Sequence, residues 1–476
     1  MNILIKSLTE HASVKRLQGR AKVLGSRLAD HHVSLAVTGL SKSGKTAFIT
    51  SIVNQLLHGR DSQTLPFFSV VAQKRLIGVK RAVQPDMTVA RFAYEDGVDK
   101  LFSEPPQWPK STDGVSQVRL LIKYQNQSGL RRILSEQSTL TLDITDYPGE
   151  WLLDLPLLEM NYRQWCESFW SDLKDAKKSE LADAFKQSLS GIDWQAEPDE
   201  IQIQTIAELF TQFLHACKEA GFQLIQPGRF VLPGELVGAP VLQFFPVPPE
   251  QLDVELQSEQ AGVVELMTSR YEQYQKKVIK PFYKQHFKRF DRQIVLVDCL
   301  TALNQGAHSF NDLRNAINWL LSSFHYGRSN LLKRIFSPNI DKLMFAASKS
   351  DHITPDQQSN LVVLLESMIH QARQQIQYEG VETESTAFSA IKASQVGVSH
   401  INNEQVQVLQ GLNKTGESIA LFPGEVPKMC PDESFWAQQG FAFPEFLPAK
   451  PTSHQTGFEH IRLDHVLEFV LGDKLE

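Results

Sequence analysis

The chain has 476 residues, of which 42% are hydrophobic and 21% charged, and 48 Lys and Arg against 54 Asp and Glu give a formal net charge of −6. This composition is typical of folded globular proteins and argues against a disordered chain or a coiled coil, and the charge is too small to indicate nucleic acid as a general partner. No run approaches the roughly 18 apolar residues of a spanning helix, and the first residues form no signal-peptide core. Four cysteines lie far apart without a Cys-x-x-Cys pair, which argues against structural zinc. We therefore expect a cytoplasmic protein of two or three domains or of one elaborated core.

The first thirty residues carry six Lys or Arg against two acidic residues, with apolar residues at about helical spacing. We assign residues 1–33 to an N-terminal helical segment. A basic amphipathic helix can lie on an anionic membrane, which would place the protein at the periphery of the inner membrane. The alternative, which we favour, is a helix that packs against the core.

A glycine-rich loop follows the first strand-like segment, residues 34–38. Its sequence, Gly39-Leu40-Ser41-Lys42-Ser43-Gly44-Lys45-Thr46, matches the Walker A pattern of Gly, four residues and Gly-Lys-Thr. From Ala47 onward, apolar residues recur at helical spacing. Strand, loop and helix in this order are the context in which the pattern binds phosphate. The alternative is a glycine turn before an ordinary helix.

The residue types of this loop suit phosphate chemistry. Gly39 and Gly44 let the backbone wrap closely, so that the N–H groups of residues 41–47 point at phosphate oxygens. Lys45 would reach the β- and γ-phosphates, and the Thr46 hydroxyl would bind Mg²⁺.

A second motif, Asp146-Tyr147-Pro148-Gly149, follows the strand-like segment 140–145. Asp146 would hold Mg²⁺, and the N–H of Gly149 would sense the γ-phosphate. The next residue, Glu150, stands where Ras-like and Gα proteins carry the glutamine that orients the attacking water. A carboxylate could orient water or act as a base, or it could repel the γ-phosphate and slow the reaction; both interpretations stay open.

Two further motifs concern the base. Strand-like residues 341–347 lead into Ser348-Lys349-Ser350-Asp351, which resembles the Asn/Thr-Lys-x-Asp box by which GTPases read guanine. Asp351 would accept hydrogen bonds from the guanine N1–H and amine, and the Lys349 stem would lie on the base. Ser348 replaces the usual Asn, so one hydrogen bond that tethers the loop is weaker or absent. Ser389-Ala390-Ile391 resembles the Ser-Ala-Lys box, and its backbone N–H groups, at Ala390 and Ile391, would approach the guanine O6.

The four motifs occur in the order found in GTPases, each at the end of an apolar strand-like run. Ligands of open α/β sheets bind outside the carboxyl ends of the strands. The sequence therefore predicts an α/β fold with a Ras- or Gα-like P-loop NTPase core, a mixed and mostly parallel sheet, and a site for GTP or GDP with Mg²⁺.

The threonine that would close over Mg²⁺ has no distinct motif. A strand at 118–124 is predicted to pair antiparallel with 140–145, and just before it lies Thr112, our candidate, with Ser111 as the alternate. An ordinary loop hydroxyl is the alternative.

The sequence also gives no clear candidate for the positively charged side chain that would speed GTP hydrolysis. Residues 92–118 contain no Arg, so the arginine that Gα proteins place before the switch threonine is absent there, and Lys110 is the nearest cation. Arg75, Arg81 and Arg91 are candidate substitutes. Because such an arginine contributes about 10³–10⁵ in rate, we predict slow hydrolysis without a partner.

These positions divide the chain. Residues 34–152 form the first part of the core, with an insertion at 58–110. Residues 153–291 form a mostly helical insertion that follows the Asp-x-x-Gly motif directly, so its position could report the nucleotide state. Residues 292–476 form the second part, with a strand at 293–298, a hairpin and loop at 404–451 and a final helix at 458–471.

The chain resembles the YcjX-like family of bacterial stress-associated P-loop proteins. The resemblance is carried by residues 36–48, by Asp146-Tyr147-Pro148-Gly149-Glu150-Trp151-Leu152 and by residues 443–448 and 460–464, and it covers essentially the whole chain. Members are described as heat-shock-inducible, predicted ATPases or GTPases, often encoded beside a small membrane protein. The resemblance implies nucleotide binding, a stress-related role and an unknown protein effector or activating partner, with a membrane protein as one candidate.

Three functions stay open. The first, which we predict, is a slow GTPase switch with Lys45, Thr112 and Glu150 as catalytic residues and Thr46, Thr112 and Asp146 as metal ligands. The second is an ATPase of chaperone or remodelling type, for which Lys349 and Asp351 would be ordinary surface charges. The third is a scaffold that binds nucleotide without useful catalysis, which the departures at Glu150 and Ser348 favour.

Overall fold

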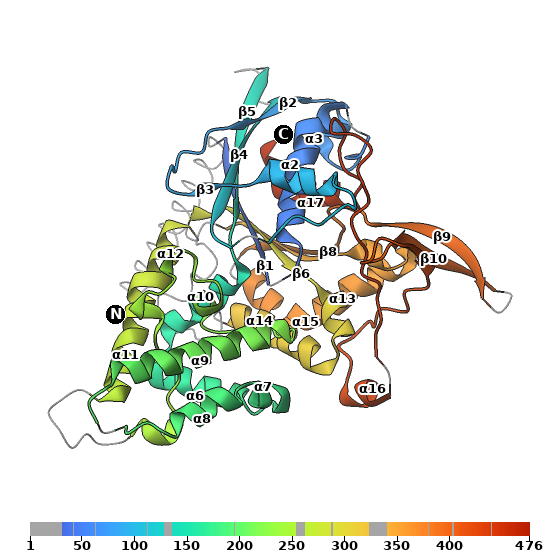
Figure 1. The fold of residues 1–476 in the computed structure, drawn as a ribbon. Coiled ribbons are helices and arrows are strands. Elements are labelled where there is room, and N and C mark those ends of the chain that lie inside the picture. The colour runs from blue at the N-terminus through green and yellow to red at the C-terminus, as the bar shows by residue number, and fades with distance from the viewer. Residues whose placement is uncertain are drawn as a thin grey trace, which may run out of the picture.

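A mixed, mostly parallel β-sheet lies at the centre of the computed structural model, with strand order β2-β4-β5-β1-β6-β7-β8 and β3 paired beside β4 (Figure 1). The strands are β1 His32–Gly39, β2 Leu76–Ala82, β3 Ala90–Arg91, β4 Ser116–Gln125, β5 Gln137–Asp146, β6 Arg292–Val297, β7 Lys342–Ala347 and β8 Glu382–Ala387. The structure describes residues 31–476 except 41, 62, 112, 128–135, 195, 254–261, 287–288, 323–339, 379, 402–403 and 439. The predicted N-terminal helical segment therefore lies outside the described residues, apart from residues 31–33.

Both faces of the sheet are buried, which explains why its central strands are apolar runs. Leu35 and Val37 of β1 pack on one face against Phe48 and Ile52, whereas Ala36 belongs to the hydrophobic core on the opposite face. The helices of the core are α2 Lys45–His58, α3 Ser69–Ala72, α4 Tyr94–Leu101, α13 Cys299–Asn304, α14 Ala307–Ser322, α15 Gln358–Tyr378 and α17 Leu463–Leu471. Strands buried on both faces are the usual arrangement of parallel sheets.

Residues 153–291, which the sequence predicts as a helical insertion and which we continue to call by that name, lie between β5 and β6 and below the sheet in Figure 1. Its helices are α6 Tyr162–Asp172, α7 Ala176–Leu181, α8 Asp183–Leu189, α9 Glu200–Glu219, α10 Gly228–Val231, α11 Val263–Tyr274 and α12 Lys280–Gln285, with one π-helical turn between the last two, Gln275–Ile279. No strand occurs in its described part. It begins within the 3₁₀ segment Gly149–Glu159.

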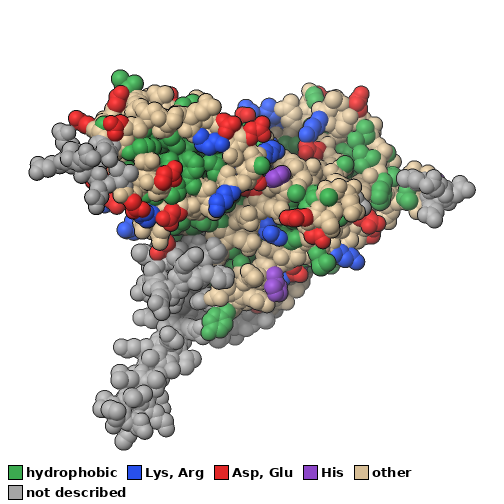
Figure 2. Space-filling model, turned by 90° about the horizontal axis from the view of Figure 1, so that it is seen from below, with side chains coloured by type: hydrophobic (Ala, Val, Ile, Leu, Met, Phe, Trp, Pro, Cys, Tyr) green, Lys and Arg blue, Asp and Glu red, His purple; other side chains and the backbone are tan. Residues whose placement is uncertain are grey.

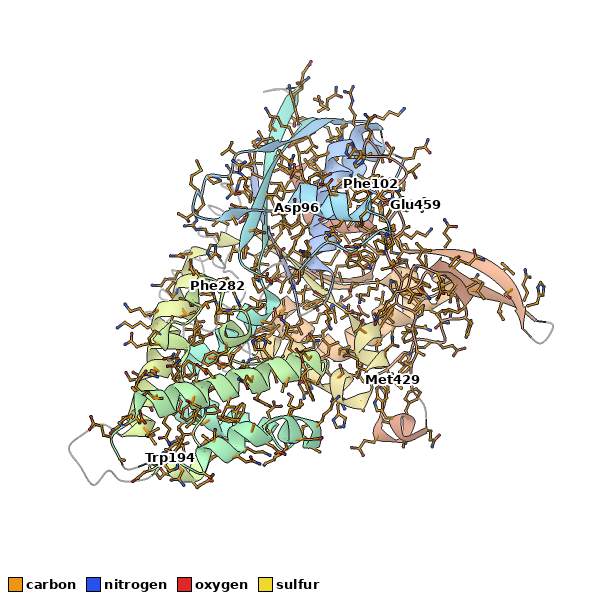
Figure 3. All side chains as sticks on the ribbon, in the orientation of Figure 1. Asp96, Phe102, Trp194, Phe282, Met429 and Glu459 are labelled. Atoms are coloured by element: carbon orange, nitrogen blue, oxygen red, sulfur yellow. The ribbon has the colours of Figure 1, made fainter. Side chains whose placement is uncertain are left out.

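Aromatic side chains fill the core of this insertion. Trp165 stacks on Tyr271 with ring centroids 5.3 Å apart and contacts Phe244 edge-on at 5.4 Å. Phe282 of α12 lies where the insertion meets the sheet (Figure 3), and its ring contacts those of Tyr147 and Trp151 at 5.8 and 5.6 Å. The segment after the second motif is thus packed into the insertion by its own side chains.

Three local predictions can be compared with the structure. The predicted antiparallel strand at 118–124 is confirmed, since β4 pairs antiparallel with β5 from Ser116 to Gln125. The predicted hairpin is confirmed between β10 Glu404–Leu412 and β11 Ser418–Leu421, which pair antiparallel, with β9 Ser394–Ile401 on the other side of β10. The final helix begins at Leu463 rather than at residue 458, because the backbone of Ile461 pairs with that of Ser389.

The hairpin projects from the core, and the short helix α16, Glu433–Gln438, follows it (Figure 1). Figure 2 views the molecule from the end that carries the helical insertion, and acidic and basic side chains are interspersed over the face that it shows. Among the described residues, no helix is long and apolar enough to cross a membrane.

Candidate functional site

The four sequence motifs meet in one cleft at the carboxyl edge of the sheet, which we call the edge cleft. Its volume is about 580 Å³, within the range of small-molecule sites. The motif residues that line it are Lys42, Ser43, Gly44, Lys45, Thr46, Ala47, Pro148, Glu150, Ser348, Lys349, Asp351, Ser389, Ala390 and Ile391. Parallel strands place their carboxyl ends at one edge, and this explains how segments far apart in sequence come together.

The glycine-rich loop, residues 39–46, has a backbone that requires its two glycines. Gly44 precedes α2 with φ 86°, in the left-handed region that favours glycine. At Gly39, an added Cβ would lie 2.3 Å from Ser43 Oγ and 2.9 Å from Leu296 O. Ser41, predicted to bind phosphate through its N–H, lies outside the described residues.

Lys45 is folded back over this loop. Its Nζ donates to the carbonyl oxygens of Gly39, at 2.7 Å, and of Leu40, at 3.4 Å. Burial lowers the pKa of Lys45, against the raising effect of the Glu150 and Asp146 charges. The Ser43 Oγ is buried without a hydrogen-bond partner in the described structure. An ammonium and an unpartnered hydroxyl beside the N-terminus of α2 suit an anionic ligand with several oxygens.

The predicted metal ligands lie on two neighbouring elements. Thr46 is the second residue of α2, and Asp146, 1% exposed, ends β5 opposite Val37 of β1. The described residues contain no cluster of three or more His, Cys, Asp or Glu suited to a metal. Mg²⁺ needs none, because it commonly takes one or two protein ligands together with phosphate oxygens and water. The hydroxyl and the carboxylate present fit such a site.

The third predicted ligand, Thr112, lies outside the described residues. Its alternate, Ser111, lines the edge cleft, as does Asp113 on the other side of position 112. The described residues on both sides of position 112 therefore line the cleft.

The second motif lies directly on the glycine-rich loop. A Cβ at Gly149 would lie 1.9 Å from Gly39 O, so that only glycine fits there. Glu150 is 6% exposed, and its Oε1 lies 2.9 Å from Lys218 Nζ. Burial raises the pKa of the Glu150 carboxyl, but the charges of Lys45 and Lys218 and the hydrogen bond from Lys218 outweigh it and hold the pKa below its usual value.

The residues predicted to read the base also line the cleft. Lys349 Nζ contacts Asp298 Oδ2 at 2.5 Å and donates to Thr301 Oγ1 at 3.0 Å. Burial lowers the pKa of Lys349, but the adjacent Asp298 carboxylate outweighs it and raises the pKa. Asp351 is buried, and its Oδ2 accepts from Ala393 N at 2.7 Å.

The loop at Ser348 is joined to β6 by a backbone hydrogen bond, in which the Ser348 N–H donates to Val297 O at 3.0 Å. The Ser348 Oγ lies 3.5 Å from the same oxygen. Of the Ser-Ala-Lys box, Ala390 accepts from Ser51 Oγ at 2.5 Å through its carbonyl. Both Ala390 and Ile391 face the cleft.

Several cleft residues were missed by sequence reasoning. They are Trp108, Lys218, Leu232, His352, Lys414, Glu445, Phe446 and Leu447. Trp108 Nε1 donates to Phe446 O at 3.0 Å, and Lys414 pairs with Glu445 at 2.5 Å, so the C-terminal loop forms one wall. The only sequence signal for this wall is the family-like run at 443–448; Lys218 has none.

The candidate arginines lie elsewhere. Arg75 donates to the carbonyl oxygens of Gln125 and Leu475, Arg81 pairs with Glu95, and Arg91 is exposed on β3. The described residues that line the cleft include five lysines and no arginine.

Comparison with known proteins adds two findings. The model of the YcjX-like family, DUF463, matches residues 33–475. A protein of Escherichia coli strain K12, named Ras-like GTPase YcjX, is 45% identical over 466 residues, which are 97% of this chain and 100% of that protein. A protein of Shewanella oneidensis with the same name is 44% identical over 479 residues, 98% of this chain and 99% of that protein.

Proposed function

This chain belongs to the YcjX-like family, and from that premise we propose that it binds guanine nucleotides with Mg²⁺ and hydrolyses GTP slowly as a molecular switch. The proposal takes the sheet and the glycine-rich loop as a Ras- or Gα-like P-loop core from which the helical insertion projects. Two relatives that match 97% and 98% of this chain are named Ras-like GTPase, which supports the choice of nucleotide. A stress-related role is part of the proposal and rests on the resemblance to the family.

One observation carries the proposal: four separate motifs, each after its own strand, line a single cleft. Lys-x-Asp sequences are frequent on surfaces, and an Asp-x-x-Gly sequence is usually a turn. Their convergence with a glycine-rich loop, in the order that GTPases use, favours one nucleotide that spans the cleft from Lys45 to Asp351.

In the proposed complex, the backbone N–H groups of the loop and the Ser43 hydroxyl donate to phosphate oxygens. Lys45 exchanges its contacts with the Gly39 and Leu40 carbonyls for the β- and γ-phosphates. Thr46 and Asp146 would hold Mg²⁺, which when bound would neutralise charge on the phosphates. Water oxygen forms the new bond to the terminal phosphorus, the bond to the bridging oxygen breaks, and GDP, inorganic phosphate and a proton result.

The switch in this proposal is the segment that begins at Gly149. The insertion holds it closely, because a Cβ at Gly228 would lie 2.1 Å from Glu150 O. Asp154, in the same segment, accepts from Gly228 N at 2.7 Å and from Tyr274 Oη at 2.5 Å. A γ-phosphate that draws Gly149 toward itself would therefore change the packing of α10 and α11, which an effector could read.

The proposal is tested by titrating the full chain with GDP, GTP, ADP and ATP in Mg²⁺, together with the variants Asp351→Asn and Asp356→Asn. We expect a preference for guanine that collapses in Asp351→Asn and persists in Asp356→Asn, whose side chain is exposed outside the cleft. Adenine binding that equals or exceeds guanine binding would overturn the base assignment and favour an ATPase.

A scaffold without useful catalysis is the second candidate. It is favoured by the buried Glu150 carboxylate, which lies beside Lys45 and would repel a γ-phosphate. Tight nucleotide binding without turnover under single-turnover conditions would support it.

A further inference from the structure

A lysine of the helical insertion enters the edge cleft close to the glycine-rich loop. Lys218 stands in the last turn of α9, and its side chain, 25% exposed, lines the cleft together with Lys45 and Thr46. Its Nζ lies 2.9 Å from Glu150 Oε1. No sequence motif marks this position.

The Glu150 carboxylate lies within the electrostatic reach of two ammonium groups. The charges of Lys45 and Lys218 both lower the pKa of the Glu150 carboxyl, although burial raises it. The Lys218 charge also acts on Lys45, in the direction that lowers its pKa. Lys218, paired with Glu150, and Lys45, folded over the glycine-rich loop, both line the cleft, and two ammonium groups there suit an anion with more than one negative charge.

We propose that Lys218 binds the terminal phosphate of GTP and that the Glu150 carboxylate takes the place of this phosphate when it is absent. This inference rests on the proposed function. It assigns to the insertion the positive charge that no arginine of the described cleft supplies. Entry of the phosphate then separates Glu150 from Lys218, so that the segment after Gly149 moves when the terminal phosphate arrives.

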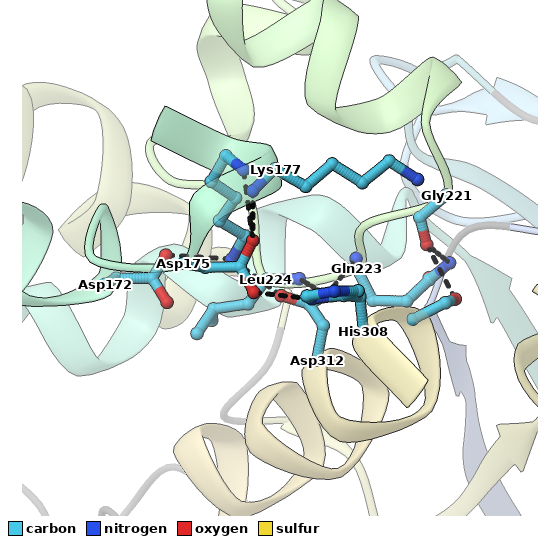
Figure 4. Close-up of polar contacts among 10 residues, drawn as sticks. Asp172, Asp175, Lys177, Gly221, Gln223, Leu224, His308 and Asp312 are labelled. Atoms are coloured by element: carbon cyan, nitrogen blue, oxygen red, sulfur yellow. Dashed lines mark hydrogen bonds and ion pairs between the residues drawn. The ribbon is translucent and has the colours of Figure 1, made fainter. Parts of the chain in front are cut away.

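The turn that follows α9, three residues after Lys218, is held by contacts with α14 (Figure 4). In the turn after α9, Gly221 O accepts from Ser309 Oγ of α14 at 3.2 Å. Asp312, also on α14, accepts from the N–H groups of Gln223 and of Leu224, the latter at 2.9 Å, and pairs with Lys178 at 2.7 Å. A charge held in position before the substrate arrives is more effective than a mobile one, because it needs no reorganisation.

The other lysines of the cleft have other partners or places. Lys349 contacts Asp298, and Lys414 contacts Glu445. Lys42 lies on the glycine-rich loop itself with φ 61°. Lys218 alone, among the described cleft lysines, is paired with the residue after Asp-x-x-Gly. An ammonium is a point charge without the planar fork of a guanidinium, so we expect its contribution to be smaller than that of an arginine.

The test compares Lys218→Met, Lys218→Arg and the control Lys276→Met, an exposed lysine of the same insertion. Affinities for GDP and for a non-hydrolysable GTP analogue are measured with single-turnover rates of GTP hydrolysis. For Lys218→Met we expect about tenfold weaker analogue binding, GDP binding within about twofold of wild type, and hydrolysis slower by about 10². Lys218→Arg should restore the analogue affinity, and Lys276→Met should behave as wild type.

A purely structural ion pair would give a different result. Loss of such an ion pair would change the affinities for GDP and for the analogue by the same factor. In a Glu150→Gln background, where the pair is already lost, Lys218→Met would change neither affinity further. In the background of Glu150→Gln, we therefore expect Lys218→Met still to weaken analogue binding about tenfold. Equal affinities of Glu150→Gln and the double variant for the analogue would overturn the proposal. The double variant leaves no unpaired buried charge, so it serves even where Lys218→Met does not fold.

Failure of the proposed function has a separate signature. If the wild-type chain binds no guanine nucleotide, the proposed function as a GTPase switch fails, whatever the variants do. If wild type binds and hydrolyses GTP while Lys218→Met matches it, only the assignment of Lys218 fails.

Discussion

Glu150 and Lys218 form an ion pair of 2.9 Å that joins the residue after Asp-x-x-Gly to the last turn of α9. Gly228 packs against the backbone of the same glutamate. The insertion therefore holds residue 150 both by its charge and by its backbone. A partly buried pair of this kind contributes little net stability but fixes geometry, because each charge is costly without its partner.

Replacing Glu150 by Gln should favour the triphosphate state. The substitution keeps the shape of the side chain and removes a negative charge beside Lys45, so repulsion of a terminal phosphate falls. We expect the GTP analogue to bind about tenfold more tightly and GDP to bind about as before. Isothermal titration with both nucleotides in Mg²⁺ measures this, and unchanged or weaker analogue binding would contradict it.

The hydrolysis rate of the same variant separates the two roles open to Glu150. A fall of about 10² or more would make the carboxylate the group that orients or deprotonates water. An unchanged rate would leave the scaffold interpretation ahead.

Asp146→Asn tests the metal site. The amide keeps the size of the carboxylate but loses its charge, so Mg²⁺ should be held less strongly between the phosphates and β5. We expect about tenfold weaker binding of the GTP analogue in Mg²⁺. In EDTA the variant should bind at least as tightly as the wild type, because without the metal the Asp146 charge only repels the phosphates. Equal affinities in Mg²⁺ would remove Asp146 from the site.

Much of the central fold follows from local sequence patterns. The apolar run at 34–38, the glycine-rich loop and the helical spacing after Ala47 predict β1 and α2, and the structure has β1 His32–Gly39 and α2 Lys45–His58. The central strands are short apolar runs because parallel strands are buried on both faces. Their order along the chain was enough to predict that the motifs would lie together.

Contacts between distant segments could not be predicted in the same way. Lys218 reaches Glu150 only because the aromatic core of the insertion and the Asp312 contacts orient α9, and no periodicity shows which helix end faces a cleft. The C-terminal helix was predicted too long for a related reason: apolar Phe458 and Ile461 fit helical spacing, but Ile461 pairs with Ser389 instead. The position of the candidate Arg75 could not be predicted either, because its guanidinium donates to the carbonyl oxygen of Leu475, which lies 400 residues further along the chain.

Asp154 should make stability depend on pH. Burial raises its pKa from 3.8 to about 6, against the lowering effect of the hydrogen bond from Tyr274 and the nearby Arg229 charge. The folded chain then holds this proton more tightly than the unfolded chain, so the free energy of unfolding falls as pH rises from about 4 to about 6. The loss from this group is about 3 kcal/mol.

Denaturant unfolding of wild type and Asp154→Asn across this pH range isolates the effect. The difference in stability, wild type minus variant, should decrease as pH rises. Asp183→Asn, which alters an exposed aspartate of α8, is the control and should keep the wild-type profile. A difference that is constant with pH, or that grows, would contradict the assignment.

Gly228→Ala should weaken the packing of the insertion against the segment that begins at Gly149, the proposed switch. The new Cβ would lie 2.1 Å from Glu150 O and 2.5 Å from Glu150 C, and neither backbone atom can give way without moving α10 or residue 150. We expect the free energy of unfolding to fall by about 1–3 kcal/mol.

The rate of proteolytic cleavage of the insertion should also no longer differ between the GDP and GTP-analogue states, because the contact between Gly228 and residue 150 is what couples the insertion to the nucleotide. The matched control is Gly191→Ala, where the nearest atom to the new Cβ, Ser188 O, lies at 3.9 Å. A Gly228→Ala variant that keeps wild-type stability and nucleotide-dependent proteolysis would show that the insertion does not follow the switch through this contact.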